Sequence, residues 1–327
     1  MAVHESADET LLSLGDRLLR VSGPQSALRE TLRLLRAGTA REPLTASGAG
    51  QGLLEELDRL GWLTSEEPRT FRGETYERQA DYLALFTPDT AAAQERLLRS
   101  RVALIGVGGI GSVVTQHLVA SGVGAYWLLD PDTVAGHNLN RQFVYGPQDE
   151  GAPKVEALAR YVRGVRPDAE VTGVRLRVTG AADLSAALPD DLDLVVVAAD
   201  GPPGLAAAVW EWAGVTRTAM SIAAVGVGSG FWGPLLDPGQ GSCLDCFEQL
   251  RRTRFTAVER ELEERSADPA PFSFGPGNTA IAAMLAHDIL QYLCSGDCPT
   301  LERRAVLDFV RQRITHSEKS SCTCPKK

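Results

Sequence analysis

A cluster of glycines follows an apolar run at residues 102–105 and could cradle phosphate groups. Glycine at these positions permits a tight turn and lets a phosphate approach bare backbone, where N–H groups and the start of a helix attract anions. Asp130 ends the next apolar run, about 20 residues further on, where a carboxylate can hold ribose hydroxyls. The pattern predicts a nucleotide site, and taken alone it fits both NAD and ATP. The glycines are Gly106, Gly108, Gly109 and Gly111.

Two basic residues beyond Asp130 favour ATP. Arg141 and Lys154 follow the acid closely, and an NAD site has no need of cations there. A triphosphate carries several negative charges, and charge that develops on phosphorus must be stabilised. We therefore expect ATP chemistry, against the alternatives of an NAD-dependent oxidoreductase and of a scaffold that holds no nucleotide.

In this segment the chain resembles the ubiquitin-activating-enzyme superfamily. The resemblance is to its bacterial adenylyltransferase branch (ThiF, MoeB and HesA), which includes the activators of the molybdopterin and thiamine sulfur-carrier proteins. The shared pattern is G-x-G-G-x-G, then D-x-D-x-V-x-x-x-N-x-x-R-Q, then P-K, within residues 106–154. It implies that the glycines surround the ATP phosphates, that Asp130 holds the ribose, and that Arg141 and Lys154 stabilise the transition state. The other implied nucleotide contacts are Asp132, Asn138 and Gln142.

Two further residues gain a role from the same resemblance. Asp200 follows the apolar run 194–199 and matches the family acid that binds Mg²⁺, although the family usually has Asp-Asn where this chain has Asp-Gly. An isolated Asp after a strand could equally cap the next helix. Upstream, Tyr76-Glu-Arg78-Gln resembles the family's Y-x-R-Q helix. Its arginine enters the ATP site of the partner subunit, which implies a homodimer with Arg78 supplied in trans.

Four of the six cysteines form two close pairs, Cys243 with Cys246 and Cys322 with Cys324. Four thiolates satisfy tetrahedral Zn²⁺, and the family carries a structural zinc here. The second pair is C-x-C, one residue shorter than the family's usual C-x-x-C. We expect a zinc-bearing C-terminal segment.

Two other features of the cysteines bear on the chemistry. We interpret Cys294 and Cys298 as packing thiols. Residues 247–275, which correspond to the family's crossover loop, contain no cysteine. Because thioester-forming relatives place one there, we expect the reaction to stop at an acyl-adenylate.

The alternation of strand and helix patterns must position these residues. It predicts an α/β fold with a Rossmann-like, doubly wound and mostly parallel sheet. A helix at 279–294 and a strand at 305–310 are expected to follow. The expected strands lie near 101–106, 125–130, 170–177, 193–198 and 217–222, and the expected helices near 111–122, 153–164, 181–187 and 203–213.

The first part of the chain has a different pattern. Apolar residues at helical spacing predict short helices over 11–14, 28–35 and 53–63. We expect a small helical or winged-helix domain at residues 1–70 and an adenylation domain at 71–327. The first resembles the peptide clamps of enzymes that modify ribosomal peptides, and the whole arrangement resembles the microcin-C-type peptide adenylyltransferases. A dimerisation or solubility cap is the alternative.

Composition limits the partners. The chain has 327 residues, 44% of them hydrophobic, with 33 basic against 42 acidic side chains and a net charge of −9. The charge argues against a nucleic-acid binder. The N-terminus lacks the basic start and apolar core of a signal peptide, and no apolar run reaches the ~18 residues of a membrane span. We expect a cytoplasmic protein without nucleic-acid or membrane partners.

These patterns together predict an ATP- and Mg²⁺-dependent adenylyltransferase. It would activate a carboxylate of a ribosomally made precursor peptide as acyl-AMP, with release of pyrophosphate, in the biosynthesis of a peptide natural product such as an antibiotic. Two alternatives remain. One is activation of the C-terminal glycine of a ubiquitin-like sulfur-carrier protein. The other is a non-catalytic peptide-binding partner of a second enzyme.

Overall fold

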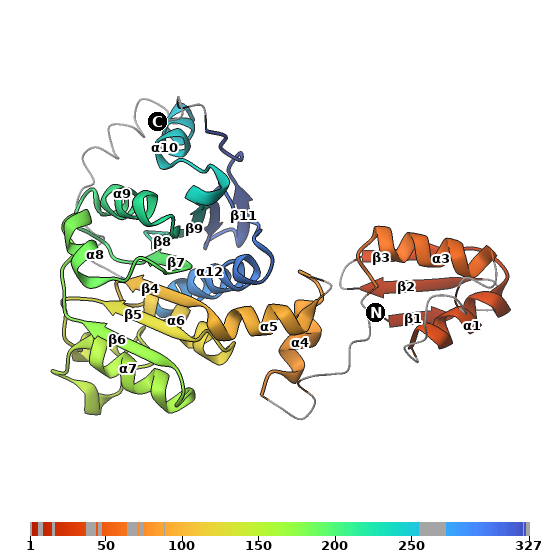
Figure 1. Ribbon diagram of the computed structural model, residues 1–327, viewed down its shortest axis with the longest axis horizontal. Coiled ribbons are helices and arrows are strands. Elements are labelled where there is room, and N and C mark those ends of the chain that lie inside the picture. The colour runs from red at the N-terminus through yellow and green to blue at the C-terminus, as the bar shows by residue number, and fades with distance from the viewer. Residues whose placement is uncertain are drawn as a thin grey trace. The chain divides into compact units, whose positions relative to one another are not determined.

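The computed structural model forms two compact units, Met1–Ala92 and Ala93–Lys327 (Figure 1). The domain boundary predicted at residue 70 falls outside the described residues. The structure describes residues 2–5, 9–14, 17–36, 44, 48–63, 71, 75–87, 89–254, 273–322 and 324.

The first unit combines a small sheet with helices. Strands β1 (Ala2–Glu5), β2 (Thr10–Leu14) and β3 (Arg17–Val21) form an antiparallel sheet in that order. The expected helix at 11–14 is therefore wrong: Leu12 lies opposite both Val3 and Leu19 in a central strand.

Two of the helices expected in this unit are present. They are α1 (Gln25–Arg36) and α3 (Gly48–Arg59), and both contribute to a leucine core with β2. Helix α4 (Glu77–Leu83) follows in the same unit, and α5 (Thr90–Arg99) begins at its end and continues into the second unit. The unit is thus mixed α/β rather than helical. The core residues are Leu12, Leu28, Leu32, Leu53 and Leu57.

The second unit is built on an eight-stranded sheet with the order β11-β10-β9-β8-β7-β4-β5-β6. Its parallel part confirms the prediction of an α/β, doubly wound sheet. The order of the strands reverses at β4, which pairs with β5 on one side and with β7 on the other. The parallel strands are β4 (Arg101–Ile105), β5 (Ala125–Leu129), β6 (Glu170–Val174), β7 (Leu194–Val197) and β8 (Ala219–Val225).

Three antiparallel strands extend the sheet beyond β8. They are β9 (Ser229–Leu236), β10 (Ala305–Asp308) and β11 (Arg313–His316). The sequence patterns predicted β10 alone of these.

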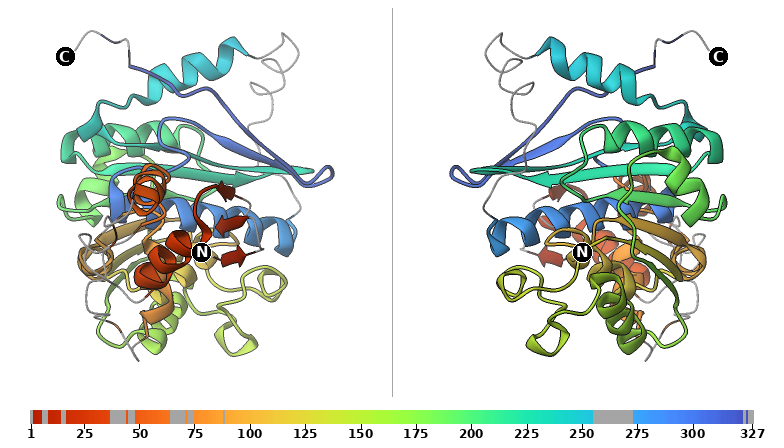
Figure 2. Two further views of the ribbon diagram at one scale, coloured as in Figure 1. Left: turned by 90° about the vertical axis from the view of Figure 1, so that its right-hand side faces the viewer. Right: turned by 90° about the vertical axis from the view of Figure 1, so that its left-hand side faces the viewer.

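Helices cover both faces of the sheet. One face carries α6 (Gly111–Ala120), α7 (Lys154–Val165) and α12 (Gly275–Ser295), and Figure 2 shows α12 running along the sheet beneath β8 and β9. The other face carries α8 (Ala181–Ala187), α9 (Leu205–Thr216) and α10 (Leu244–Thr253). Among the described residues, no helix has the length and apolar character needed to cross a bilayer.

Side chains along the buried strands alternate between the two faces of the sheet, which determines the helices that each side chain contacts. Ala103 and Ile105 on β4 and Val195 on β7 pack against α8 and α9, in a core that includes Trp212. The intervening residues point to the opposite face, since successive side chains alternate. Because β4, β5 and β7 are parallel, their carboxyl ends lie at the same edge of the sheet. The strand order reverses at β4, and α/β proteins bind ligands where the order reverses.

Candidate active site

A cavity of about 910 Å³ opens at this edge of the sheet. Gly111 is absent from its lining, and Arg78 lies in α4 of the first unit. Of the residues predicted from the sequence, Gly106, Gly108, Gly109, Asp130, Asp132, Asn138, Arg141, Gln142, Lys154 and Asp200 line the cavity.

The glycine loop is close-packed on one side and open on the other. A Cβ on Gly106, whose φ is +88°, would lie 2.7 Å from the Ala199 backbone nitrogen. A Cβ on Gly111 would lie 2.0 Å from the Gly106 carbonyl oxygen, so Gly111 serves the turn itself. At Gly108 the nearest atom would be Nε2 of Gln142, at 3.6 Å. The backbone at Gly108 is therefore where an anion can approach.

Asp130 and Tyr145 hold the loop in this shape. The buried Asp130 carboxylate accepts hydrogen bonds from the backbone nitrogens of Val107, at 2.8 Å, and Asp132, at 2.9 Å. The Tyr145 hydroxyl donates to the Val107 carbonyl at 2.8 Å. Burial raises the pKa of Tyr145 well above its ordinary value, so the hydroxyl remains a donor. The loop is thus fixed from both sides.

Both predicted cations are held by neighbouring oxygens. The Lys154 ammonium lies 3.0 Å from an Asp132 carboxylate oxygen. Arg141 donates to the His137 carbonyl at 2.6 Å and to the Asn140 side-chain oxygen at 3.0 Å. These contacts hold both positive charges in place at the cavity wall.

Asp200 belongs to the same electrostatic environment. Partial desolvation by the cavity walls raises the pKa of its carboxyl, and the charges of Arg141 and Lys154 oppose that rise. The alternative of a helix cap is wrong, because α9 begins at Leu205 with Gly204 as its N-cap. A carboxylate beside two cations could hold Mg²⁺ on a phosphate chain.

Sequence patterns missed Asn278, which lies in the first turns of α12. This side chain is buried and donates from Nδ2 to the Ser273 hydroxyl at 2.8 Å. A Cβ on Gly109 would lie 2.6 Å from the same Nδ2. A buried Asn is uncommon, and an Asn close to the start of a mostly apolar helix was the signal available in the sequence. Arg177, a third cation of the lining, was also missed.

The cavity suits a nucleotide. Its volume lies within the range of about 300–1,000 Å³ typical of cofactor sites, and apolar side chains that could contact a base line part of it. The buried Oε1 of Gln142 has no hydrogen-bond partner in the described structure. Such an orphaned amide is expected where a ligand completes the site. The apolar wall includes Ile105, Leu129, Leu176, Val178 and Leu205.

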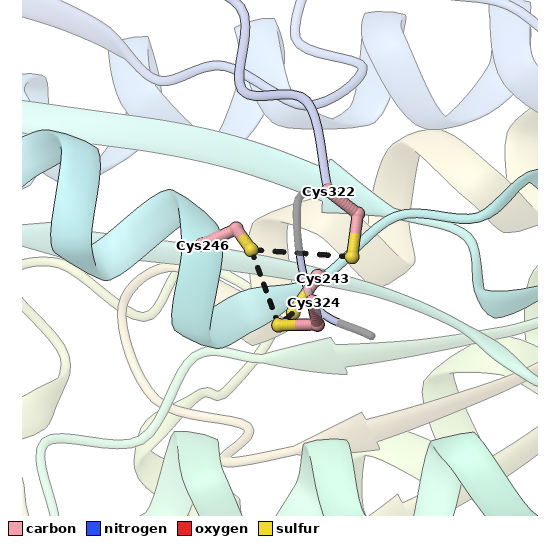
Figure 3. A group of neighbouring side chains, drawn as sticks. All are labelled: Cys243, Cys246, Cys322 and Cys324. Atoms are coloured by element: carbon pink, nitrogen blue, oxygen red, sulfur yellow. Dashed lines mark hydrogen bonds between the residues drawn. The ribbon is translucent and has the colours of Figure 1, made fainter. Parts of the chain in front are cut away.

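The four paired cysteines meet at the start of α10, and Figure 3 shows their sulfurs converging. All four Sγ atoms lie within 4.8 Å of one another. Cys243 and Cys324 are 3.8 Å apart and Cys246 and Cys322 are 3.9 Å apart. Zn–S bonds of about 2.3 Å give a tetrahedron with edges of about 3.8 Å. The donor set and spacing therefore fit zinc, and the shorter C-x-C pair does not prevent it.

Local structure brings the two pairs together. Cys243 is the N-cap of α10, and Cys246 lies in its first turn. Near the C-terminus, Ser320 donates to the Glu302 carbonyl from its backbone nitrogen, at 2.8 Å, and from its hydroxyl, at 3.1 Å. Hydrogen bonds with the side chains of Cys246 and Cys243 raise the pKa of Cys324 to about 12, and the negative charge of a Cys243 thiolate adds to the rise. A divalent cation would oppose that rise.

The remaining cysteines lie apart from this cluster. Cys294 and Cys298 are both buried, and neither belongs to the group of four. Burial raises the pKa of Cys294 to about 11 and of Cys298 to about 12. They fit the packing interpretation.

Comparison with known proteins agrees with this geometry. The ThiF family profile matches residues 76–326. The chain belongs to the ThiF family. Its match to the SAMP-activating enzyme E1 of Haloferax volcanii is 47% identical over 85 residues, 26% of this chain and 32% of the relative. The match to the sulfur carrier protein adenylyltransferase of Thermus thermophilus is 38% identical over 110 residues, 34% and 40% of the two chains. The chain thus matches about a third to two-fifths of the length of these relatives.

Solved structures share the fold over nearly the full length. The crystal structure of E. coli MccB with MccA-N7isoASN has a TM-score of 0.83 at 20% identity, covering 98% of this chain and 95% of that one. The same protein with ATP gives 0.81 at 21% identity, covering 98% and 96%. PaaA gives 0.72 at 19% identity, covering 98% and 99%. At these identities the likeness establishes the fold of this ThiF-family chain.

Proposed function

We propose that this protein is an ATP- and Mg²⁺-dependent adenylyltransferase that activates a peptide carboxylate as acyl-AMP. The observation that carries the proposal is the convergence of Arg141, Lys154 and Asp200 on one cavity beside the glycine loop. Two cations and an acid suit a metal-bound triphosphate that must lose pyrophosphate. Hydride transfer to or from NAD does not require this combination of two cations and an acid.

In the proposed reaction a carboxylate oxygen attacks the α-phosphorus of ATP. The new P–O bond forms as the bond from the α-phosphorus to the bridging oxygen breaks, and pyrophosphate leaves with that electron pair. Lys154 and Arg141 stabilise the negative charge on the α-phosphoryl oxygens and the leaving group. Gly108 and Gly109 present backbone to the phosphates, and Asp130 orients the ribose. Asp200 would hold Mg²⁺, which neutralises and orients the phosphate chain.

We propose that the four cysteines hold a structural zinc ion. The site uses all four tetrahedral positions for protein sulfur, which is typical of closed structural sites rather than catalytic ones. It would tie α10 to the C-terminal segment.

We favour a ribosomally made precursor peptide as the substrate, in natural-product biosynthesis. The first unit supports this choice, because a three-stranded sheet with edges at β1 and β3 can accept a peptide as an added strand. MccB has been crystallised with MccA, and the fold is shared over both units. Residues 247–275 contain no cysteine for a thioester; within them, residues 255–272 lie outside the described structure.

A sulfur-carrier protein is the second candidate. It is favoured by the printed function of the relatives, which include sulfur carrier protein adenylyltransferases. For either substrate we propose a homodimer in the cytoplasm, with Arg78 reaching the partner's ATP.

Pyrophosphate release tests the proposal. The protein is incubated with ATP, Mg²⁺ and either a short peptide encoded beside its gene or a ubiquitin-like protein that ends in Gly-Gly. We expect release with the peptide alone; the reverse result would assign the carrier function. Arg141→Ala and Asp200→Ala should each lower the rate by about 100- to 1,000-fold. Full activity of both variants in the complete pathway would instead support a non-catalytic binding partner.

A further inference from the structure

A second cavity, of about 650 Å³, adjoins the nucleotide cavity. Val225 and Ser273 line both of them. A group that occupies the second cavity can therefore place an atom in the first.

The two cavities differ in chemistry. Of the described residues that line the second cavity, none carries a charge, whereas the nucleotide cavity has acidic and basic walls. Val227 and Phe274 are each 72% exposed, and because they line the same cavity they form part of an exposed apolar patch. We call the set Val227, Phe274, Pro276, Leu307 and Phe309 the acyl pocket.

Segments from three distant parts of the sequence form the acyl pocket. Val227 belongs to the β8–β9 turn, Phe274 and Pro276 to the start of α12, and Phe309 to the β10–β11 turn. The Phe309 backbone nitrogen donates to the Gly228 carbonyl at 2.9 Å, which joins two of the turns. The pocket is therefore a built feature rather than a chance gathering of side chains on one loop.

We infer that the acyl pocket holds the apolar C-terminal end of the substrate peptide while the peptide's carboxylate is adenylated in the adjoining nucleotide cavity. The inference rests on the proposed function. The shared wall at Val225 and Ser273 brings the carboxylate of a peptide seated there toward the glycine loop. Helix α12 begins at this wall, and its positive end favours a carboxylate.

The pocket selects against other ends. A Gly-Gly end leaves it unfilled, and a polar side chain would lose water without a charged or hydrogen-bonding replacement along most of the wall. The substrate class is thus a peptide whose last two residues are apolar.

The experiment compares peptide pools that differ only in their last two residues. Pools ending in Val-Leu, Ser-Asn and Gly-Gly are tested for ATP–pyrophosphate exchange. The Ser-Asn pool is the polar control, because Asn is close to Leu in shape. We expect kcat/KM to favour Val-Leu over Ser-Asn by roughly tenfold or more.

A matched pair of variants locates the effect. Val227→Asp puts a charge in the acyl pocket, whereas Val310→Asp puts one on the β10–β11 turn at a valine that is 81% exposed and outside the lining. We expect Val227→Asp to abolish the Val-Leu preference and leave ATP affinity unchanged, and Val310→Asp to behave as wild type. Both sites are exposed, so neither change should prevent folding.

The outcomes separate this inference from the proposed function. Equal exchange with all three pools would overturn the inference and leave adenylation standing. Exchange with no pool would refute peptide adenylation; anisotropy of fluorescein-labelled Val-Leu peptide would then still report on the pocket. A fall in melting temperature in Val227→Asp alone, without any peptide preference, would assign the pocket to residues 255–272 or a second copy of the chain.

Discussion

The Lys154 ammonium is 3.0 Å from the Asp132 carboxylate, and the Lys154 side chain is only 7% exposed whereas that of Asp132 is 54% exposed. The Lys154 backbone nitrogen also donates to the Asp132 carbonyl at 3.0 Å. Asp132 in turn donates its own backbone N–H to Asp130. Hydrogen bonds therefore connect Asp130, the residue proposed to hold the ribose, to Lys154, the residue proposed to contact the phosphates.

Removal of Lys154 should abolish most activity. We expect Lys154→Ala to lower kcat for pyrophosphate release by about 100- to 1,000-fold. Asp132→Asn should cost less, because it keeps a hydrogen-bond acceptor and loses only the charge. Arg163→Ala, on the same helix at an exposed position, is the control. Equal rates in Lys154→Ala and the control would contradict the assigned role.

The Tyr145 hydroxyl should matter for ATP binding more than for stability. Tyr145→Phe removes the donor to the Val107 carbonyl, a loss of about 0.5–1.5 kcal/mol for a neutral hydrogen bond. We expect ATP affinity, measured by calorimetry, to fall by roughly threefold to tenfold. An unchanged affinity together with a large fall in melting temperature would show that Tyr145 acts only in folding.

One zinc ion per chain is expected in the purified protein. Cys322→Ser should lose it, as measured by elemental analysis, and should unfold at a lower temperature, since metal binding contributes folding free energy. Cys298→Ser should retain the metal, because that thiol lies outside the cluster. A wild-type protein that contains no zinc after purification without chelators would refute the site.

Stability should depend on Cys294 at alkaline pH. Burial raises its pKa to about 11 against the opposing charge of Arg96, so the folded protein keeps the proton that the unfolded chain releases above about pH 8.5. The contribution is fully present below that pH and is lost as pH rises toward about 11. Urea unfolding of wild type and Cys294→Ala, compared at about pH 8 and about pH 10, should show a steeper loss in wild type. An equal loss of unfolding free energy in the two proteins between these pH values would contradict the raised pKa of Cys294.

Arg78 should act on the partner's nucleotide. Arg78→Ala and Asp130→Ala homodimers are each expected to be inactive, whereas mixed dimers contain one intact site. Co-expression with two affinity tags isolates the mixed dimer, whose pyrophosphate release should approach half of wild type. Failure to recover activity in an isolated mixed dimer would argue against supply in trans.

Local signals explain how much of the site the sequence could predict. The glycine loop, Asp130, Arg141 and Lys154 lie within one continuous segment, where spacing along the chain translates directly into position. Asn278 has no such relationship, because α12 reaches the loop only through tertiary packing. The acyl pocket could not be predicted either, since the three segments that form it are far apart in sequence.

The same distinction applies to the fold. The parallel strands carry continuous apolar runs that are readily found. Strand β9 contains Gly230, Gly233 and Pro234, which weaken any strand pattern, and it forms because β8 and β10 pair with it. Strand β2 is a five-residue segment, too short for helical and alternating patterns to be distinguished. Its partners β1 and β3 decided its conformation.

The cysteine cluster has a consequence for how this chain can diversify. Cys246 and Cys322 are 76 residues apart, and the segment between them carries α12 and the β10–β11 hairpin, which form most of the acyl pocket. The zinc ion proposed for this cluster would link the two ends of the segment, so that its turns could accumulate substitutions while the ends remain anchored. Lineages could therefore acquire new substrates by changes inside this segment, while the phosphate-handling half of the enzyme stays as it is.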